Sequence, residues 1–83
     1  MSFLAKDFFV KRNVQIIKDV QELHSKEGIN IRAAMAEIAA KYEVSLKTVD
    51  AVMYTEGYSH RAEAWAIVNE ELKKEKEATK EVA

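Results

Sequence analysis

The sequence of 83 residues contains no cysteine, no proline and only two glycines. Without cysteine the chain can form neither a disulfide nor a thiolate metal site. Because helix-breaking residues are almost absent while alanine, glutamate and lysine are abundant, the composition indicates helix throughout. No alternating apolar pattern is long enough for a β-strand. The sequence therefore predicts an all-α fold.

Long apolar runs are also missing. No run approaches the roughly 20 residues needed to span a bilayer. Lys6 and Asp7 interrupt the apolar start of the chain, so we expect no signal peptide and a cytoplasmic protein. The length predicts one domain with one modest core. A net charge of −1 is low for a nucleic-acid-binding domain, which is usually basic.

Capping residues divide the chain into helices. Gly28 and Gly57 are expected to end helices in the left-handed conformation, and Asn30 and Ser59 are expected to begin them. The four predicted helices are residues 4–27, 31–42, 45–56 and 60–76. A long first helix would pack on the middle pair, and the last helix would close the domain. We expect residues 1–76 to form the domain and 77–83 to be a charged, fraying tail.

The first predicted helix has a broad apolar face made of Phe9, Val10, Val14, Ile16, Ile17, Val20 and Leu23. Asn13 and His24 fall within this face. Asn13 would either fix the register of a helical dimer or make local hydrogen bonds at the margin. His24 would be a ligand, a pH switch or, more simply, a local hydrogen-bonding group. Leu4 and Phe8 fall on the charged side, where they would form a partner surface or fold back.

The last predicted helix presents two apolar sides. The inward side would consist of Tyr58, Ala62, Trp65, Val68 and Leu72. Ala64 and Ile67 lie on a second side that we expect to be a dimer contact. Because the broad faces of the first and last helices exceed what one small core needs, the sequence predicts a homodimer.

Residues 35–54, MAEIAAKYEVSLKTVDAVMY, have the spacing of a helix-turn-helix. Ile38 and Tyr42 would point inward, and Ala39 would be small because the second helix crosses over it. Val44 would plug the turn, and Ser45 would cap the second helix of the motif. The segment resembles the helix-turn-helix in general, and the resemblance covers about a quarter of the chain. It departs from the usual pattern at Glu43, where glycine is most common because positive φ is favoured there.

The resemblance implies a DNA-reading helix over residues 45–56 within a motif spanning 31–56. Its implied contacts with double-stranded DNA are Arg32, Ser45, Leu46, Lys47, Asp50, Ala51, Tyr54 and Arg61. Lys47 would meet a phosphate or a guanine edge, and Ala51 a thymine methyl. Asp50 would accept a hydrogen bond from a cytosine amino group. Arg32 and Arg61 would hold flanking phosphates.

We expect the protein to be a small DNA-binding transcriptional regulator. Residues 31–61 hold four basic and four acidic side chains, so the motif itself is neutral. The alternative is a protein-binding adapter that keeps the helix-turn-helix shape, similar to the small phage or plasmid proteins that inhibit a host or lysis protein. No catalytic motif and no metal-ligand spacing is present, so we expect neither an enzyme nor a cofactor.

Overall fold

The computed structural model describes residues 2–82, and the side chains of residues 6–75. It consists of four α-helices, and this described part contains no β-strand. The helices are α1 (Ser2–Lys26), α2 (Ile31–Lys41), α3 (Leu46–Tyr54) and α4 (Arg61–Val82). The all-α prediction is confirmed. No helix in the described part is long and apolar enough to cross a membrane.

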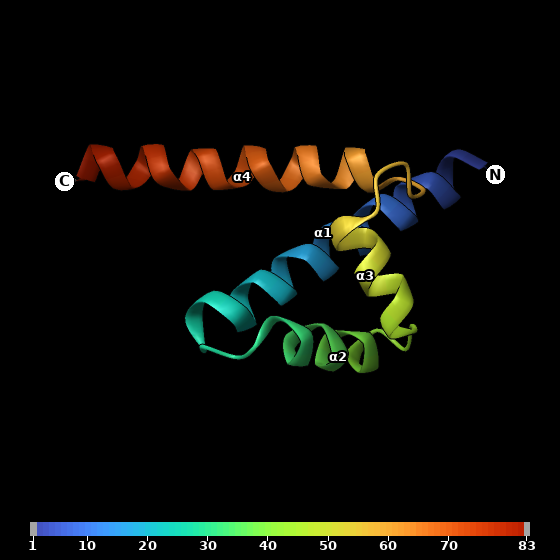
Figure 1. The fold of residues 1–83 in the computed structure, drawn as a ribbon. Coiled ribbons are helices and arrows are strands. Elements are labelled where there is room, and N and C mark those ends of the chain that lie inside the picture. The colour runs from blue at the N-terminus through green and yellow to red at the C-terminus, as the bar shows by residue number, and fades with distance from the viewer. Residues whose placement is uncertain (1, 83) are drawn as a thin grey trace.

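Helix α1 is the centre of the fold and contacts each of the other three helices. Figure 1 shows α2 and α3 on one side of it and α4 on the other. The predicted apolar face supplies much of the core, since Ile16, Ile17 and Val20 are fully buried. Phe9, at the N-terminal end of this face, remains 38% exposed. Burial of this face against three helices is the main hydrophobic stabilisation of the domain.

Asn13 lies within this core and is 0% exposed. Its side-chain amide donates a hydrogen bond to the Ser59 carbonyl at 3.3 Å, and its Oδ1 accepts from the Arg12 guanidinium at 3.0 Å. The idea that Asn13 lies at the margin is therefore wrong, because the turn before α4 covers it. His24 does make the local contact: it is exposed, and its Nδ1 donates to the Ile29 carbonyl at 2.9 Å.

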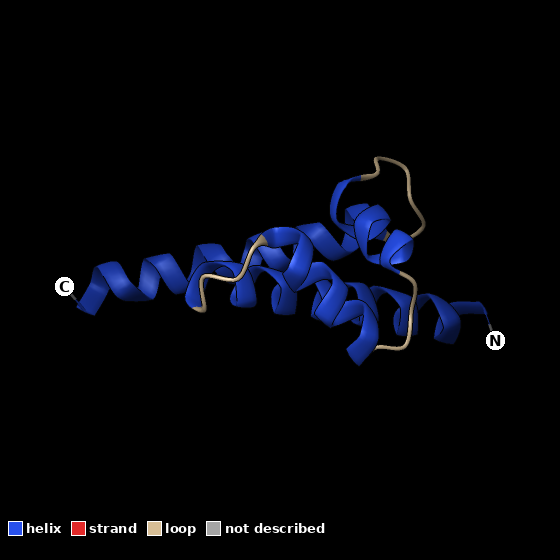
Figure 2. Ribbon diagram, turned by 60° about the horizontal axis from the view of Figure 1, so that its bottom comes forward, coloured by secondary structure: helices blue, strands red, loops and turns tan. Residues whose placement is uncertain are grey.

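The connection between α3 and α4 differs from its prediction. α3 ends at Tyr54, and Thr55–Tyr58 form a turn in which the Tyr58 amide donates to the Thr55 carbonyl at 3.2 Å. Gly57 has φ 81° at the third position of this turn, where a type II turn requires positive φ. Gly57 is therefore a turn residue and not the stop of α3. The ribbon in Figure 2 shows the connection as a loop standing out beside the helices.

The predicted cap of α4 is also wrong. The helix begins at Arg61, and the His60 carbonyl accepts its first hydrogen bond, from Ala64 N at 3.2 Å. His60, with φ 59°, thus occupies the capping position assigned to Ser59. Its ring stacks on Phe9 with 6.1 Å between centroids. This contact accompanies a backbone conformation that is unusual for a residue other than glycine.

The inward face of α4 is rotated from its predicted position. Ala64 and Val68 are buried, whereas Ala62 is exposed. The predicted inward face was counted from Tyr58, but Tyr58 lies in the turn before the helix. Counted from Arg61, the inward positions are i, i+3, i+4 and i+7. Ala64 is therefore a core residue and unavailable as a dimer contact. Ile67 is 41% exposed, as a surface residue should be.

The C-terminal part of α4 extends beyond the rest of the molecule (Figures 1 and 2). Its backbone is helical to Val82, past residue 76, where the sequence placed the end of the domain. Every described side chain from residue 69 to 75 is exposed. The side chains of the predicted tail, 77–83, and of Leu4 lie outside the described residues.

Candidate nucleic-acid interface

A short turn over residues 42–45 joins α2 to α3, within the segment whose sequence resembles a helix-turn-helix. Asn30 caps α2 by accepting a hydrogen bond from Arg32 N at 2.9 Å, as predicted. Met35, Ile38 and Ala39 are buried on its inner face. Tyr42 ends the helix, and its amide bonds back to the carbonyl of Ile38. The pattern of small and branched residues thus sets α2 against both α1 and α3.

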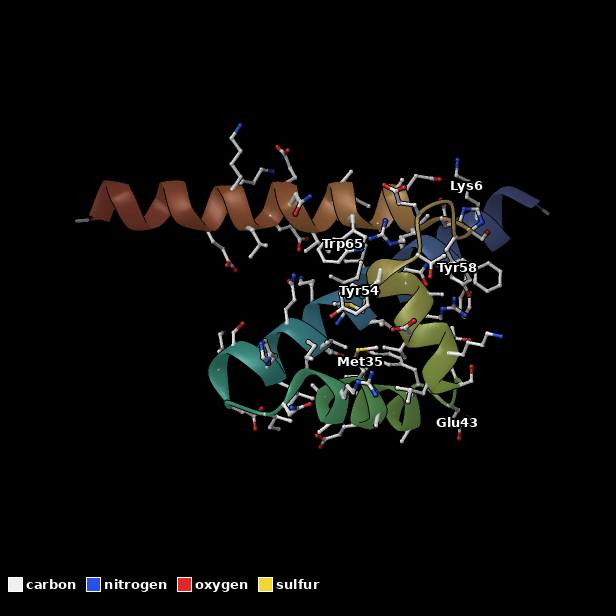
Figure 3. The ribbon with its side chains drawn as sticks, viewed as in Figure 1. Lys6, Met35, Glu43, Tyr54, Tyr58 and Trp65 are labelled. Carbon is white, nitrogen blue, oxygen red and sulfur yellow. The ribbon has the colours of Figure 1, made fainter. Side chains whose placement is uncertain are left out.

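The turn between α2 and α3 depends on Glu43, which has φ 55°. A left-handed residue at this point reverses the chain, and the Val44 amide then bonds to the Ala39 carbonyl at 2.9 Å. Val44 packs partly buried against the core. The turn therefore keeps the expected conformation with a glutamate in place of glycine. Figure 3 shows Glu43 at the outer corner of the molecule.

Ser45 caps α3, as the sequence predicted. Its Oγ accepts a hydrogen bond from Thr48 N at 3.1 Å and lies 3.0 Å from Thr48 Oγ1. Val49 and Val52 are fully buried, and Met53 is 4% exposed. These contacts fix α3 by one face and leave the opposite face to solvent.

The exposed face of α3 carries four of the predicted contact residues. Leu46 is 49% exposed and Tyr54 is 56% exposed, and Lys47 and Asp50 are also exposed. Ala51 lies beside them and is only partly exposed. We call Leu46, Lys47, Asp50 and Tyr54 the α3 strip. One lysine and one aspartate cancel, so the strip is neutral and its ends are apolar.

The two arginines that were predicted to hold flanking phosphates have different surroundings. Arg32 is exposed at the start of α2. Arg61 is half-buried: its Nη2 donates to the Met53 carbonyl at 2.9 Å, and its guanidinium lies 5.9 Å from the centre of the Trp65 ring. This contact satisfies a carbonyl at the C-terminal end of α3. The structure thus places Arg61 between α3 and α4 and leaves Arg32 accessible.

Asp19 of α1 is a residue whose role the sequence did not reveal. Its Oδ2 accepts hydrogen bonds from the Tyr42 hydroxyl at 2.5 Å and from Lys41 Nζ at 3.1 Å. Burial, followed by the hydrogen bond to Asp19, raises the pKa of the Tyr42 phenol. The same carboxylate raises the pKa of Lys41. Asp19 is 23 positions from Tyr42, so only the packing of α1 on α2 brings them together.

A groove of about 900 Å³ lies between α1 and α4, next to the end of the α3 strip. Its apolar lining consists of Ile31, Met53, Tyr54, Trp65, Val68 and Leu72. Figure 3 shows Trp65 directed from α4 towards the end of α3, where Tyr54 lies. The sequence did not predict this groove, because it depends on the angle between two helices that are distant in the chain.

No three histidine or acidic side chains among the described residues are grouped so that they could hold a metal ion. Comparison of the sequence with known protein families, curated proteins and solved structures finds no match.

Proposed function

We propose that this protein is a small DNA-binding regulator that inserts α3 into the major groove. The observation that supports the proposal is the turn, in which Glu43 has the left-handed conformation and Ser45 then caps α3, as expected for a helix-turn-helix. The core side chains of α3 hold its position, so the α3 strip is presented on a rigid element. Neither catalysis nor a cofactor is part of the proposal.

The α3 strip supplies the base contacts in this proposal. Lys47, in the first turn of the helix, reaches a phosphate or a guanine edge, and Asp50 accepts from a cytosine amino group. Tyr54 donates its hydroxyl to a phosphate at the other end. Arg32 adds a flanking phosphate contact, whereas Arg61 supports the end of α3 from within the protein. Because the strip is neutral, specific contacts must supply more of the affinity than is usual.

Fluorescence anisotropy with pooled genomic duplex fragments tests this proposal. The titration is run at low and at near-physiological salt, with excess random DNA as competitor. We expect specific binding with a shallow salt dependence, since few phosphates are neutralised. Lys47→Ala and Tyr54→Ala should each weaken binding at least tenfold. Lys73→Ala, which removes an exposed lysine from the far part of α4, is the matched control and should change little. Absence of binding at low salt would refute the DNA-binding function.

A second candidate function is supported by the exposed apolar side chains of α3 and α1. Leu46 and Tyr54 make the ends of the α3 strip apolar, and Phe8 is 63% exposed on α1. Exposed apolar side chains and a neutral α3 strip suit a protein partner. An adapter of this kind would bind no DNA and would lose its partner on Phe8→Glu or Ile67→Glu. The DNA titration therefore separates the two functions.

A further inference from the structure

Four residues line the part of the groove that lies next to the end of α3. Met53 and Tyr54 come from α3, and Arg61 and Trp65 come from α4. Figure 3 shows the Tyr54 and Trp65 rings at this place, one from each helix. Trp65 is only partly buried, although its indole donates to the Val52 carbonyl at 3.0 Å. We call these four residues the α3 end of the groove, which thus offers two aromatic rings and one cation.

The charge of Arg61 has no counterion within the domain. Its Nη2 donates to the Met53 carbonyl, but its Nε is buried without a hydrogen-bond partner among the described residues. None of the ion pairs between described side chains includes Arg61. A partly buried charge is usually paired, because burial removes some of its hydration. The α3 end of the groove therefore has a positive charge that an anion could neutralise.

We propose that the α3 end of the groove binds a small aromatic carboxylate. The carboxylate would pair with the Arg61 guanidinium, and the ring would lie against Trp65 and Tyr54. A planar guanidinium is the side chain best matched to a carboxylate. The buried Nε need not be reached, because an anion beside the groove-facing part of the guanidinium offsets its delocalised charge. Aromatic side chains with a few polar groups are the usual lining of a small-molecule site.

The size of the groove and the ion pair across it favour a small molecule over a partner helix. The volume of about 900 Å³ lies within the range of about 300–1,000 Å³ usual for small-molecule sites. Lys18 of α1 meets Glu71 of α4, with 2.9 Å between Nζ and Oε2. Glu71 is ten positions along α4 from Arg61, about 15 Å at 1.5 Å per residue. A helix laid along the groove would displace this ion pair, whereas a small ligand at the α3 end would leave it intact.

The charges along α4 also favour one orientation of the ligand. Two of the acidic side chains that line the groove, Glu71 and Glu75, are ten or more positions from Arg61. The carboxylate would therefore be attracted to the α3 end and repelled from the other end of α4.

Ligand binding goes beyond the proposed DNA binding and does not depend on it. Tyr54 belongs to both the α3 strip and the groove, so a ligand and DNA would share this side chain. The binding test is therefore made without DNA, and its variants lie outside the α3 strip. Its failure would leave the DNA titration unaffected.

Three probes separate the contribution of the carboxylate from that of the ring. Indole-3-acetate has both, indole-3-acetamide has the same ring without the charge, and acetate has the charge without the ring. Each is titrated into the ¹⁵N-labelled full chain at constant pH and salt, and the NMR signals of Arg61 Nε–H and Trp65 Nε1–H are followed. We expect indole-3-acetate to shift both signals saturably, the amide to bind at least tenfold more weakly, and acetate to leave Trp65 unchanged. Absence of a saturable shift with millimolar indole-3-acetate would overturn the proposal, as would equal binding of acid and amide.

Arg61→Gln and Lys73→Gln make a matched pair of variants on α4. Each removes one positive charge, but Lys73 is exposed and does not line the groove. Arg61→Gln should weaken binding of indole-3-acetate at least tenfold, and Lys73→Gln should change it less than twofold. Equal weakening by both variants, or none by Arg61→Gln, would refute the site. Circular dichroism checks the fold of each variant. If Arg61→Gln is unfolded, Arg61→Lys keeps the charge and should bind more weakly than the wild type while still preferring the acid to the amide. Loss of that preference, or binding as tight as in the wild type, would count against the pairing with Arg61.

Discussion

The two connections that flank α3 each contain a non-glycine residue with positive φ, yet they are held in different ways. Glu43, with φ 55°, lies in a short turn whose hydrogen bonds join near neighbours, from Val44 to Ala39 and from Thr48 to Ser45. His60, with φ 59°, lies in a longer connection that α1 holds in place. There the Asn13 amide bonds to the Ser59 carbonyl, and Phe9 stacks on His60.

The difference separates local from long-range determination of structure. The first turn is specified by residues that are adjacent in the sequence, so a sequence pattern can predict it. The second is specified by side chains 46 or more positions away, so its conformation depends on the packing of α1. Substitutions in the two connections should therefore differ in the size and even in the sign of their effects on stability.

The largest effect is expected from Asn13→Ala. This substitution removes the amide that holds the Ser59 carbonyl, and it leaves that carbonyl and the Arg12 guanidinium without their partner. We expect the free energy of unfolding to fall by about 2 kcal/mol, as for loss of a buried hydrogen bond with a small cavity. Urea unfolding followed by circular dichroism measures it, with the exposed Lys11→Ala as control. A loss no greater than that of the control would mean that α1 does not hold this connection.

Ser45→Ala comes next and tests the local turn. The substitution removes the oxygen that accepts from Thr48 N, at an expected cost of about 1 kcal/mol. Ser25→Ala is the comparison, since Ser25 is exposed near the end of α1 and should contribute little. The same unfolding measurement applies. Equal stability of the two variants would show that the cap does not stabilise α3.

Much of the structure of α2, the turn and α3 could be predicted because its signals are local. Asn30 and Ser45 cap α2 and α3 as expected, and Val49 and Val52 are buried as expected. The α3 strip follows from the same helical periodicity. The region after α3 could not be predicted in this way. The sequence predicts Ser59 as the cap of α4. In the structure the Ser59 carbonyl accepts from Asn13, and His60 occupies the capping position.

The side of α4 that faces the core depends on where the helix begins. Since Tyr58 lies in the turn and not in the helix, the pattern that it predicted was rotated, and Ala64 moved from the expected dimer surface into the core. The groove also requires the crossing of α1 and α4, which no local pattern encodes. The exposed face of α3 was thus predictable, whereas the half-buried position of Arg61 and the position of the apolar groove were not.

Glycine at the two positive-φ residues gives the most direct comparison of the connections. Glu43→Gly removes the steric strain of positive φ without loss of a core contact. We therefore expect the free energy of unfolding to rise by about 1 kcal/mol. His60→Gly relieves the same conformation but removes the ring that stacks on Phe9, a contact of about 0.5–1.5 kcal/mol, so its net effect should be near zero. Thermal and urea unfolding of both variants measures the difference. A gain from His60→Gly as large as that from Glu43→Gly would show that the Phe9 stack contributes nothing.

The smallest effect concerns a long-range contact beside the local turn, the hydrogen bond between Tyr42 and Asp19. Burial and this hydrogen bond raise the pKa of Tyr42 above its ordinary value of 10.0, and Asp19 raises that of Lys41 above 10.5. The folded state therefore keeps protons that the unfolded state has lost. The stability that these groups contribute is complete below pH 10 and declines as pH rises through the folded-state values. Unfolding in urea between neutral pH and the alkaline range should show this decline. Tyr42→Phe should reduce its slope, because one of the two groups no longer titrates. An unchanged slope would mean that the titration of Tyr42 does not contribute to the decline.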